Sequence, residues 1–171
     1  ADVIKKIQQP LVLDASGFLP IIEDKLQFTD LPPETILTPH YAEFSNMFKM
    51  DLKKVWNDPI SAVREIQAIL DGRVLILKGA TNIIVTSKGE LLLMNHGTPL
   101  LVTAGTGDVL SGIIAGAVVQ GLSLDDAAIF GTFLHGECAH QYENLISISG
   151  LTATDMLTMI PHALESLENV R

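Results

Sequence analysis

One loop carries the residues best suited to chemistry, and it reads VTAGTGDVLSGIIAGAVVQG from Val102 to Gly121. Gly105 and Gly107 allow a sharp turn and a close approach to another group because neither has a Cβ. The pattern indicates a helix from Asp108 onward, which would leave the amides of the preceding loop without intrahelical acceptors at the positive end of the helix dipole. Such an end binds anions. The loop therefore predicts a phosphate site with a carboxylate beside it, as phosphoryl transfer requires.

A simpler interpretation of the same residues stays open at this point. Thr106 could merely cap a buried helix while the glycines make a turn, because a Gly-x-Gly match is short and often occurs by chance. Asp108 fits this interpretation too, since the helix dipole stabilises any acid in a first turn.

Composition narrows the class of protein. The chain has 171 residues, 47% of them hydrophobic, and a formal net charge of −9. This length predicts a single domain, and the acidic balance argues against a nucleic-acid surface. A bound phosphate must then be held mainly by backbone amides, a few cations or a metal. Cys138 is the sole cysteine and lies in an apolar helical pattern, so we expect a packed thiol and no internal disulfide.

No segment of the sequence reads as a signal peptide or a membrane span. The longest apolar stretch, from Val109 to Leu122, is too short and is interrupted by residues that include Gly112, Gly116 and Gln120. We expect a soluble cytoplasmic protein without a membrane partner.

Short strands alternate with helices along the chain, which is typical of an α/β fold. Residues 1–9 read as the tail of a helix, and LVLDA as a strand that ends at Asp14. Further strands are expected in ETILTPH and RVLILK, followed by a hairpin over residues 82–94 that forms an antiparallel edge on a mainly parallel sheet. Helices are expected over residues 58–70, after Ser123, and from about Thr154, the last kinked at Pro161.

Five segments together resemble the ADP- or ATP-dependent NAD(P)H-hydrate dehydratases of the ribokinase-like superfamily. They read LTPHYAEF, LILKGATNIIV, GTPLLVTAGTGDVLSGIIAGAVVQG, FLHGECA and GLTATDMLTMIPHAL. The resemblance covers nearly the whole chain. It implies a ribokinase-like three-layer sandwich in which residues 1–171 form one domain, the C-terminal portion of the family's domain.

The resemblance implies a lyase that uses kinase chemistry. Members repair NADH or NADPH to which water has been added: ADP or ATP, with Mg²⁺, phosphorylates the new hydroxyl group, and loss of phosphate restores the cofactor. AMP or ADP is the other product. On this resemblance Asp108 is the general base and contacts the substrate. The anion hole is formed by the amides of Ala104, Gly105, Thr106 and Gly107.

The family's nucleotide-binding segment matches the KGATN loop, which is Lys78, Gly79, Ala80, Thr81 and Asn82, and Gly107 also touches the nucleotide. His40 matches the histidine that contacts the hydrated dinucleotide. Two departures weaken this match, because the family has Pro-Gly where Tyr41 and Ala42 stand and a further aspartate where Ser16 stands. We expect Glu43 to brace the loop.

The remaining histidines read as structural or surface residues. They are His96, His135 and His140, and their spacing predicts no protein-built metal site.

The largest difference between this chain and the family is its length. Family members begin with a substantial segment before the equivalent of Pro10, and its absence would expose a sheet edge and an apolar face. Either another polypeptide supplies this part, or residues 1–171 are the remainder of a cleaved or truncated protein. We expect the second, with the missing N-terminal fragment bound noncovalently wherever it persists. The resemblance also leaves open a homo-oligomer, since members are often tetramers.

Two other functions remain alternatives. The first is a ribokinase-like kinase that phosphorylates a hydroxymethyl vitamin precursor, because it would share the glycine loop and its aspartate. The second is a noncatalytic nucleotide-binding subunit, which the substituted positions would favour.

Overall fold

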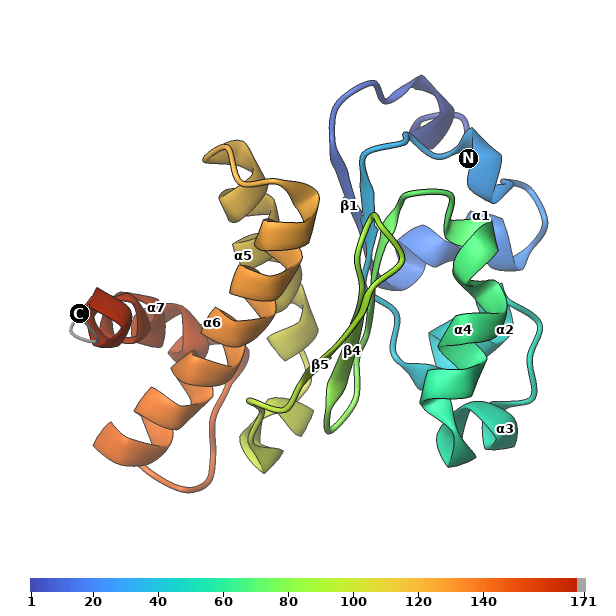
Figure 1. The fold of residues 1–171 in the computed structure, drawn as a ribbon. Helices are drawn as coiled ribbons and strands as arrows, with labels where there is room; N and C mark the ends of the chain where they lie inside the picture. The colour runs from blue at the N-terminus through green and yellow to red at the C-terminus, as the bar shows by residue number, and fades with distance from the viewer. Residues whose placement is uncertain (169–171) are drawn as a thin grey trace.

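A five-stranded sheet runs through the middle of the molecule in the computed structural model, which describes residues 1–168 (Figure 1). The strands lie side by side in chain order, with bounds Leu11–Leu13 (β1), Thr35–Leu37 (β2), Val74–Leu77 (β3), Asn82–Val85 (β4) and Leu91–Met94 (β5). β1, β2 and β3 pair in parallel, whereas β4 is antiparallel to both of its neighbours. The predicted antiparallel hairpin is therefore confirmed, and β4 alone runs against the other strands.

Helices cover both faces of this sheet (Figure 1). One face carries α1 (Leu19–Ile22), α2 (Tyr41–Met47), α3 (Leu52–Asn57) and α4 (Pro59–Leu70). The other carries α5 (Thr106–Val119) and α6 (Leu124–Leu145), with α7 (Ala153–Glu168) packed on α6. The connections contain the 3-10 turns Ile4–Lys6, Ala15–Phe18, Phe28–Asp30 and Pro99–Val102.

The central strand β3 shows why this sequence needs two helical layers. All of its residues are buried. Leu75 and Leu77 belong to the core under α2 and α4, while Val74 and Ile76 belong to the core under α5 and α6. Successive side chains of a strand point to opposite faces, so a continuous apolar strand requires a cover on each side. The predicted three-layer α/β arrangement follows.

Helix ends match the sequence signals in most places. The Asp58 side chain accepts the Ser61 amide at the start of α4, and Asp71, with a φ of 47°, ends the helix. Ser123 caps α6 as expected. The first nine residues depart from expectation, because they form only the 3-10 turn Ile4–Lys6 and no longer helix. The last helix begins at Ala153 and continues through Pro161.

No helix in residues 1–168 is both long enough and apolar enough to cross a membrane.

Glycines in α6 allow the close packing that the sequence predicted. A Cβ on Gly131 would lie 2.5 Å from the Cγ1 of Ile114 on α5. A Cβ on Gly136 would collide with the carbonyl oxygen of His96 in the loop after β5. By contrast, nothing lies within 4 Å of a Cβ placed on Gly116 of α5.

These contacts predict opposite effects for the same substitution in two helices. Gly136→Ala should lower the free energy of unfolding by about 2 kcal/mol, because a backbone carbonyl must move. Gly116→Ala should raise it by roughly 0.5–1 kcal/mol, the usual helix preference of alanine over glycine. Urea denaturation of both variants measures the two values. Equal effects would show that packing at Gly136 is looser than the structure indicates.

Candidate functional site at the first turn of α5

The carboxyl ends of three parallel strands meet at one edge of the sheet. Asp14 follows β1, Thr38 follows β2 and Lys78 follows β3. The Thr38 hydroxyl donates to the Leu13 carbonyl at 3.3 Å, and the Lys78 amide donates to the Pro39 carbonyl at 2.8 Å. Open α/β sheets bind ligands at this edge. These hydrogen bonds fix the loops that would line such a site.

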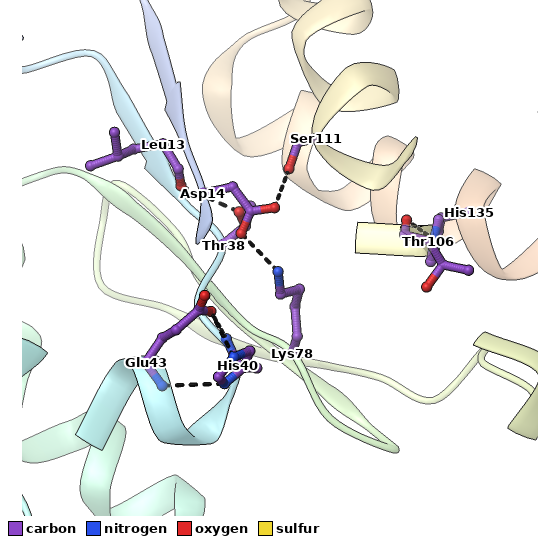
Figure 2. Close-up of polar contacts among 9 residues, drawn as sticks. All are labelled: Leu13, Asp14, Thr38, His40, Glu43, Lys78, Thr106, Ser111 and His135. Atoms are coloured by element: carbon purple, nitrogen blue, oxygen red, sulfur yellow. Dashed lines mark hydrogen bonds and ion pairs between the residues drawn. The ribbon is translucent and has the colours of Figure 1, made fainter. Parts of the chain in front are cut away.

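Asp14, Lys78 and Ser111 form a polar cluster at this edge, and their side chains point toward one another (Figure 2). Lys78 Nζ lies 2.8 Å from Asp14 Oδ1, and the Ser111 hydroxyl of α5 donates to Asp14 Oδ2 at 2.8 Å. The Lys78 and Asp14 side chains are only 20% and 12% exposed. Burial alone would raise the pKa of the Asp14 carboxyl, but the Lys78 ammonium and the Ser111 hydroxyl outweigh it and lower that pKa. Asp14 is therefore a fixed negative charge.

Helix α5 begins two residues earlier than predicted. Gly105, with a φ of 88°, is the N-cap, and Thr106 is the first helical residue. That left-handed conformation is readily available to glycine. The Thr106 hydroxyl donates to the carbonyls of Leu101 and Thr103 at 2.8 and 2.9 Å, so it ties the turn to the preceding loop and does not cap the amides.

The expected unpaired amides are present in this turn. Those of Gly105, Gly107 and Asp108 have no acceptor within the part of the chain that the structure describes. The Thr106 amide makes one long contact, 3.4 Å to the Thr103 carbonyl. Unpaired N–H groups at a helix start attract anions, so the turn retains the capacity that the sequence suggested.

Gly107 lies directly against the Asp14–Lys78 pair. A Cβ on this residue would lie 3.3 Å from Lys78 Nζ and 3.9 Å from Asp14 Oδ2. The two glycines of the loop thus serve different needs, because Gly105 supplies the conformation and Gly107 supplies the space. The close approach places an ammonium group beside Gly107 in the turn that carries the free amides.

A cavity of about 820 Å³ opens beside this cluster. Most of the residues predicted to bind nucleotide or substrate line it, together with Thr106 of the predicted anion hole: they are His40, Lys78, Gly79, Ala80, Asn82 and Gly107. Thr81 and Ala104 do not line it. Thr81 instead donates its hydroxyl to Asn95 Oδ1 at 3.2 Å. The cavity has the size of a typical small-molecule site.

A second hollow, of about 660 Å³, lies on the other side of the same turn. Gly105 and Asp108 border it, together with apolar side chains of α5, α6 and α7. Asp108 is exposed there, and its carboxylate has no hydrogen-bond or ion-pair partner among residues 1–168. The first turn of α5 therefore separates the cavity from an apolar groove.

The loop after β2 accommodates the residues that depart from the family pattern. His40 caps α2 and exchanges hydrogen bonds with Glu43, whose carboxylate accepts the His40 amide at 2.8 Å (Figure 2). The expectation that Glu43 braces this loop is confirmed. A Cβ on Gly79 would lie 2.9 Å from the Tyr41 hydroxyl. Tyr41 therefore occupies the space that the glycine leaves open.

His135 is a site residue that the sequence reasoning missed. It lies in the middle of α6, is 6% exposed, lines the cavity and has Nε2 2.8 Å from the Thr106 carbonyl. Because a carbonyl can only accept, Nε2 carries the proton of a neutral imidazole. Burial lowers the pKa of His135 to about 4. Only the spacing from the glycine loop to His135 could have signalled this contact.

Other reactive groups do not form a second site. Burial raises the pKa of the Cys138 thiol to about 11, which leaves it unreactive and confirms a packed cysteine. Within the described residues, no three His, Cys, Asp or Glu side chains come together to hold a metal.

The His135 contact predicts a pH dependence of stability. The folded-state pKa lies below the unfolded value of 6.5, so the unfolded chain binds more protons, and stability present above pH 6.5 is lost as the pH falls toward 4. At pH 5 the loss from this residue should be about 2 kcal/mol. Urea denaturation of wild type and His135→Gln at pH 7 and 5 measures it. An equal pH dependence in both proteins would contradict the assignment.

Curated relatives match most of this chain. The bifunctional NAD(P)H-hydrate repair enzyme Nnr of Moorella thermoacetica is 33% identical over an alignment 171 positions long, which covers 98% of this chain and 31% of that protein. The ADP-dependent (S)-NAD(P)H-hydrate dehydratase of Neisseria meningitidis serogroup B is 35% identical over 86% of this chain and 51% of its own length. The chain thus spans about a third to a half of these curated relatives.

Solved structures show the same fold. The ADP/ATP-dependent NAD(P)H-hydrate dehydratase of Bacillus subtilis, co-crystallised with ATP/Mg²⁺ and soaked with CoA, superposes with a TM-score of 0.84 at 27% identity, over 96% of this chain and 59% of that one. A hydroxyethylthiazole kinase of Pyrococcus horikoshii OT3 shares the fold at a TM-score of 0.63 and 15% identity, over 91% of this chain and 59% of its own. The Carb_kinase family model, described as NAD(P)H-hydrate dehydratase, matches residues 2–162, and the chain therefore belongs to this family.

Proposed function

We propose that this chain provides the phosphoryl-transfer site of an NAD(P)H-hydrate dehydratase, a hydro-lyase of class EC 4.2.1. The substrate is hydrated NADH or NADPH, the phosphoryl donor is ADP or ATP, and the products are the reduced cofactor, phosphate and AMP or ADP. One observation carries this proposal. The unpaired amides of Gly107 and Asp108 lie in the same turn as the Asp108 carboxylate, and Gly107 also packs against the Lys78 ammonium.

The nucleotide is proposed to occupy the cavity lined by Lys78, Gly79 and Gly107. Its terminal phosphate would accept the free amides of the turn and one hydrogen of the Lys78 ammonium. Mg²⁺ would neutralise charge on the phosphates. Since the described residues contain no carboxylate cluster for a metal, the ion would be held largely by the nucleotide, as Mg²⁺ commonly is.

Asp108 is proposed to accept the proton of the hydrate hydroxyl as that oxygen attacks the phosphoryl group. Its carboxylate is exposed and unpartnered within residues 1–168, whereas Asp14 is committed to Lys78 and Ser111. The amides would stabilise the charge on the phosphoryl oxygens, an effect worth roughly 3 kcal/mol per donor in related sites. Asp108 is thus the available base and Asp14 is not.

The groove between α5 and α7 is proposed to be covered by further polypeptide. It is apolar, and β1 lies at the edge of the sheet, with no strand of the described chain on its outer side. The relatives contain polypeptide beyond the part that this chain matches. We propose that residues 1–171 form the C-terminal portion of one ribokinase-like domain, and that its N-terminal portion, or a second copy in a homo-oligomer, covers this surface.

Asp108→Asn should abolish most turnover while leaving ADP affinity nearly unchanged. Loss of a general base costs about 10²- to 10⁴-fold in rate, and the amides that bind the phosphate remain. Single-turnover kinetics give the rate, and calorimetric titration gives the ADP affinity. Asp51→Asn, at the start of α3, is the matched control, because asparagine also caps helices well. Unchanged turnover in Asp108→Asn would refute the base assignment.

The decisive experiment mixes hydrated NADH or NADPH with ADP or ATP and this chain, and follows absorbance of the reduced nicotinamide together with released phosphate. Because the relatives are longer, the assay is repeated with the complete product of the source gene. Stoichiometric phosphate and reduced cofactor are expected. A phosphorylated small alcohol that accumulates in place of these products would favour the kinase alternative. ADP binding without turnover by either protein would favour a noncatalytic subunit.

A further inference from the structure

We propose that Asp14 is a positioning residue for Lys78: it holds the ammonium against the first turn of α5, and the ammonium cancels a carboxylate charge that would otherwise repel a phosphate there. The proposal rests on the proposed function for the nature of the anion. Its structural basis is the buried ion pair between two residues 64 positions apart, packed on the Cα of Gly107.

Asp14 is held from two sides, which fixes the direction of the Lys78 side chain. Ser111 donates to one carboxylate oxygen and Lys78 to the other, both at 2.8 Å. Ser111 stands four residues after Gly107 in α5, and residues at this spacing share one face of a helix. The cluster therefore links the end of β1, the end of β3 and the anion-binding turn.

The ammonium has capacity left for a ligand. A lysine carries three N–H donors, and Asp14 is the only acceptor of Lys78 Nζ within the described residues. Two donors thus remain for phosphoryl oxygens that reach Gly107. A free lysine would lose rotamer entropy when a ligand immobilised it, whereas Lys78 is already ordered by its pair.

The pair also explains why a carboxylate can sit beside an anion site. Asp14 Oδ2 lies 3.9 Å from the position of a Cβ on Gly107. Removing one partner of a buried ion pair leaves the other charge uncompensated. Loss of Lys78 alone should therefore lower the affinity for phosphate in two ways, because a cation is removed and the Asp14 charge is exposed to the ligand.

The test is a double-mutant cycle on ADP affinity, measured by calorimetry in EDTA and again with Mg²⁺. The proteins are wild type, Asp14→Asn, Lys78→Gln and the double variant, each checked by thermal melting. In EDTA, Lys78→Gln should weaken ADP about 30-fold or more, and the double variant should bind about tenfold more tightly than Lys78→Gln. Asp14→Asn should change the affinity by less than about threefold, because the loss of an ordered lysine is offset by the removal of a negative charge beside the phosphate. If Lys78→Gln does not fold, Ser111→Ala and Asp14→Asn/Ser111→Ala replace it.

Ser111→Ala should weaken ADP about twofold in wild type and have no effect once Asp14 is asparagine, because it acts only through that carboxylate. If Asp14 had only a structural role, the double variant would bind ADP more weakly than Lys78→Gln does. That result overturns the proposal. Weaker binding of Asp14→Asn only with Mg²⁺ also overturns it, since Asp14 would then serve a metal. A wild type that fails to bind ADP overturns it too. ADP binding without hydrate turnover leaves this role standing and refutes only the proposed function.

Discussion

The structure depends on keeping the first turn of α5 unpaired where three parallel strands end. Free N–H groups are costly when buried and useful when a ligand can reach them. These N–H groups stay unpaired while the polar groups around them are hydrogen-bonded. The Thr106 hydroxyl donates to the preceding loop, His135 donates to the Thr106 carbonyl, and the Ser111 hydroxyl donates to Asp14. Hydrogen bonds hold the residues around the turn in place, while the amides of Gly107 and Asp108 remain available to a ligand.

Much of this arrangement was visible in the sequence. Apolar runs located the strands, helix caps such as Asp58 and Ser123 located helix starts, and the glycine loop located the anion-binding turn. These features are local, because the residues that decide them lie within a few positions of one another. The helix start at Thr106 was misplaced since the left-handed Gly105 can precede a helix directly, which composition alone does not reveal.

The contacts that organise the site were beyond sequence reasoning because they join distant positions. Asp14 and Lys78 are separated by 64 residues, and Thr106 and His135 by 29. A lone acid after a strand and a lone histidine in a helix each have many ordinary explanations. Only the parallel register of β1, β2 and β3 brings their ends to one edge, and only the packing of α6 on α5 brings His135 beneath the turn.

The packing of Tyr41 on Gly79 links two loops that would otherwise vary independently. Any side chain at position 79 would run into the Tyr41 hydroxyl, so the small residue is required here by a protein neighbour as well as by any ligand. Exchange of Tyr41 for a small residue would release that constraint on position 79. The identity of residue 41 thus determines whether position 79, which lines the cavity, can carry a side chain.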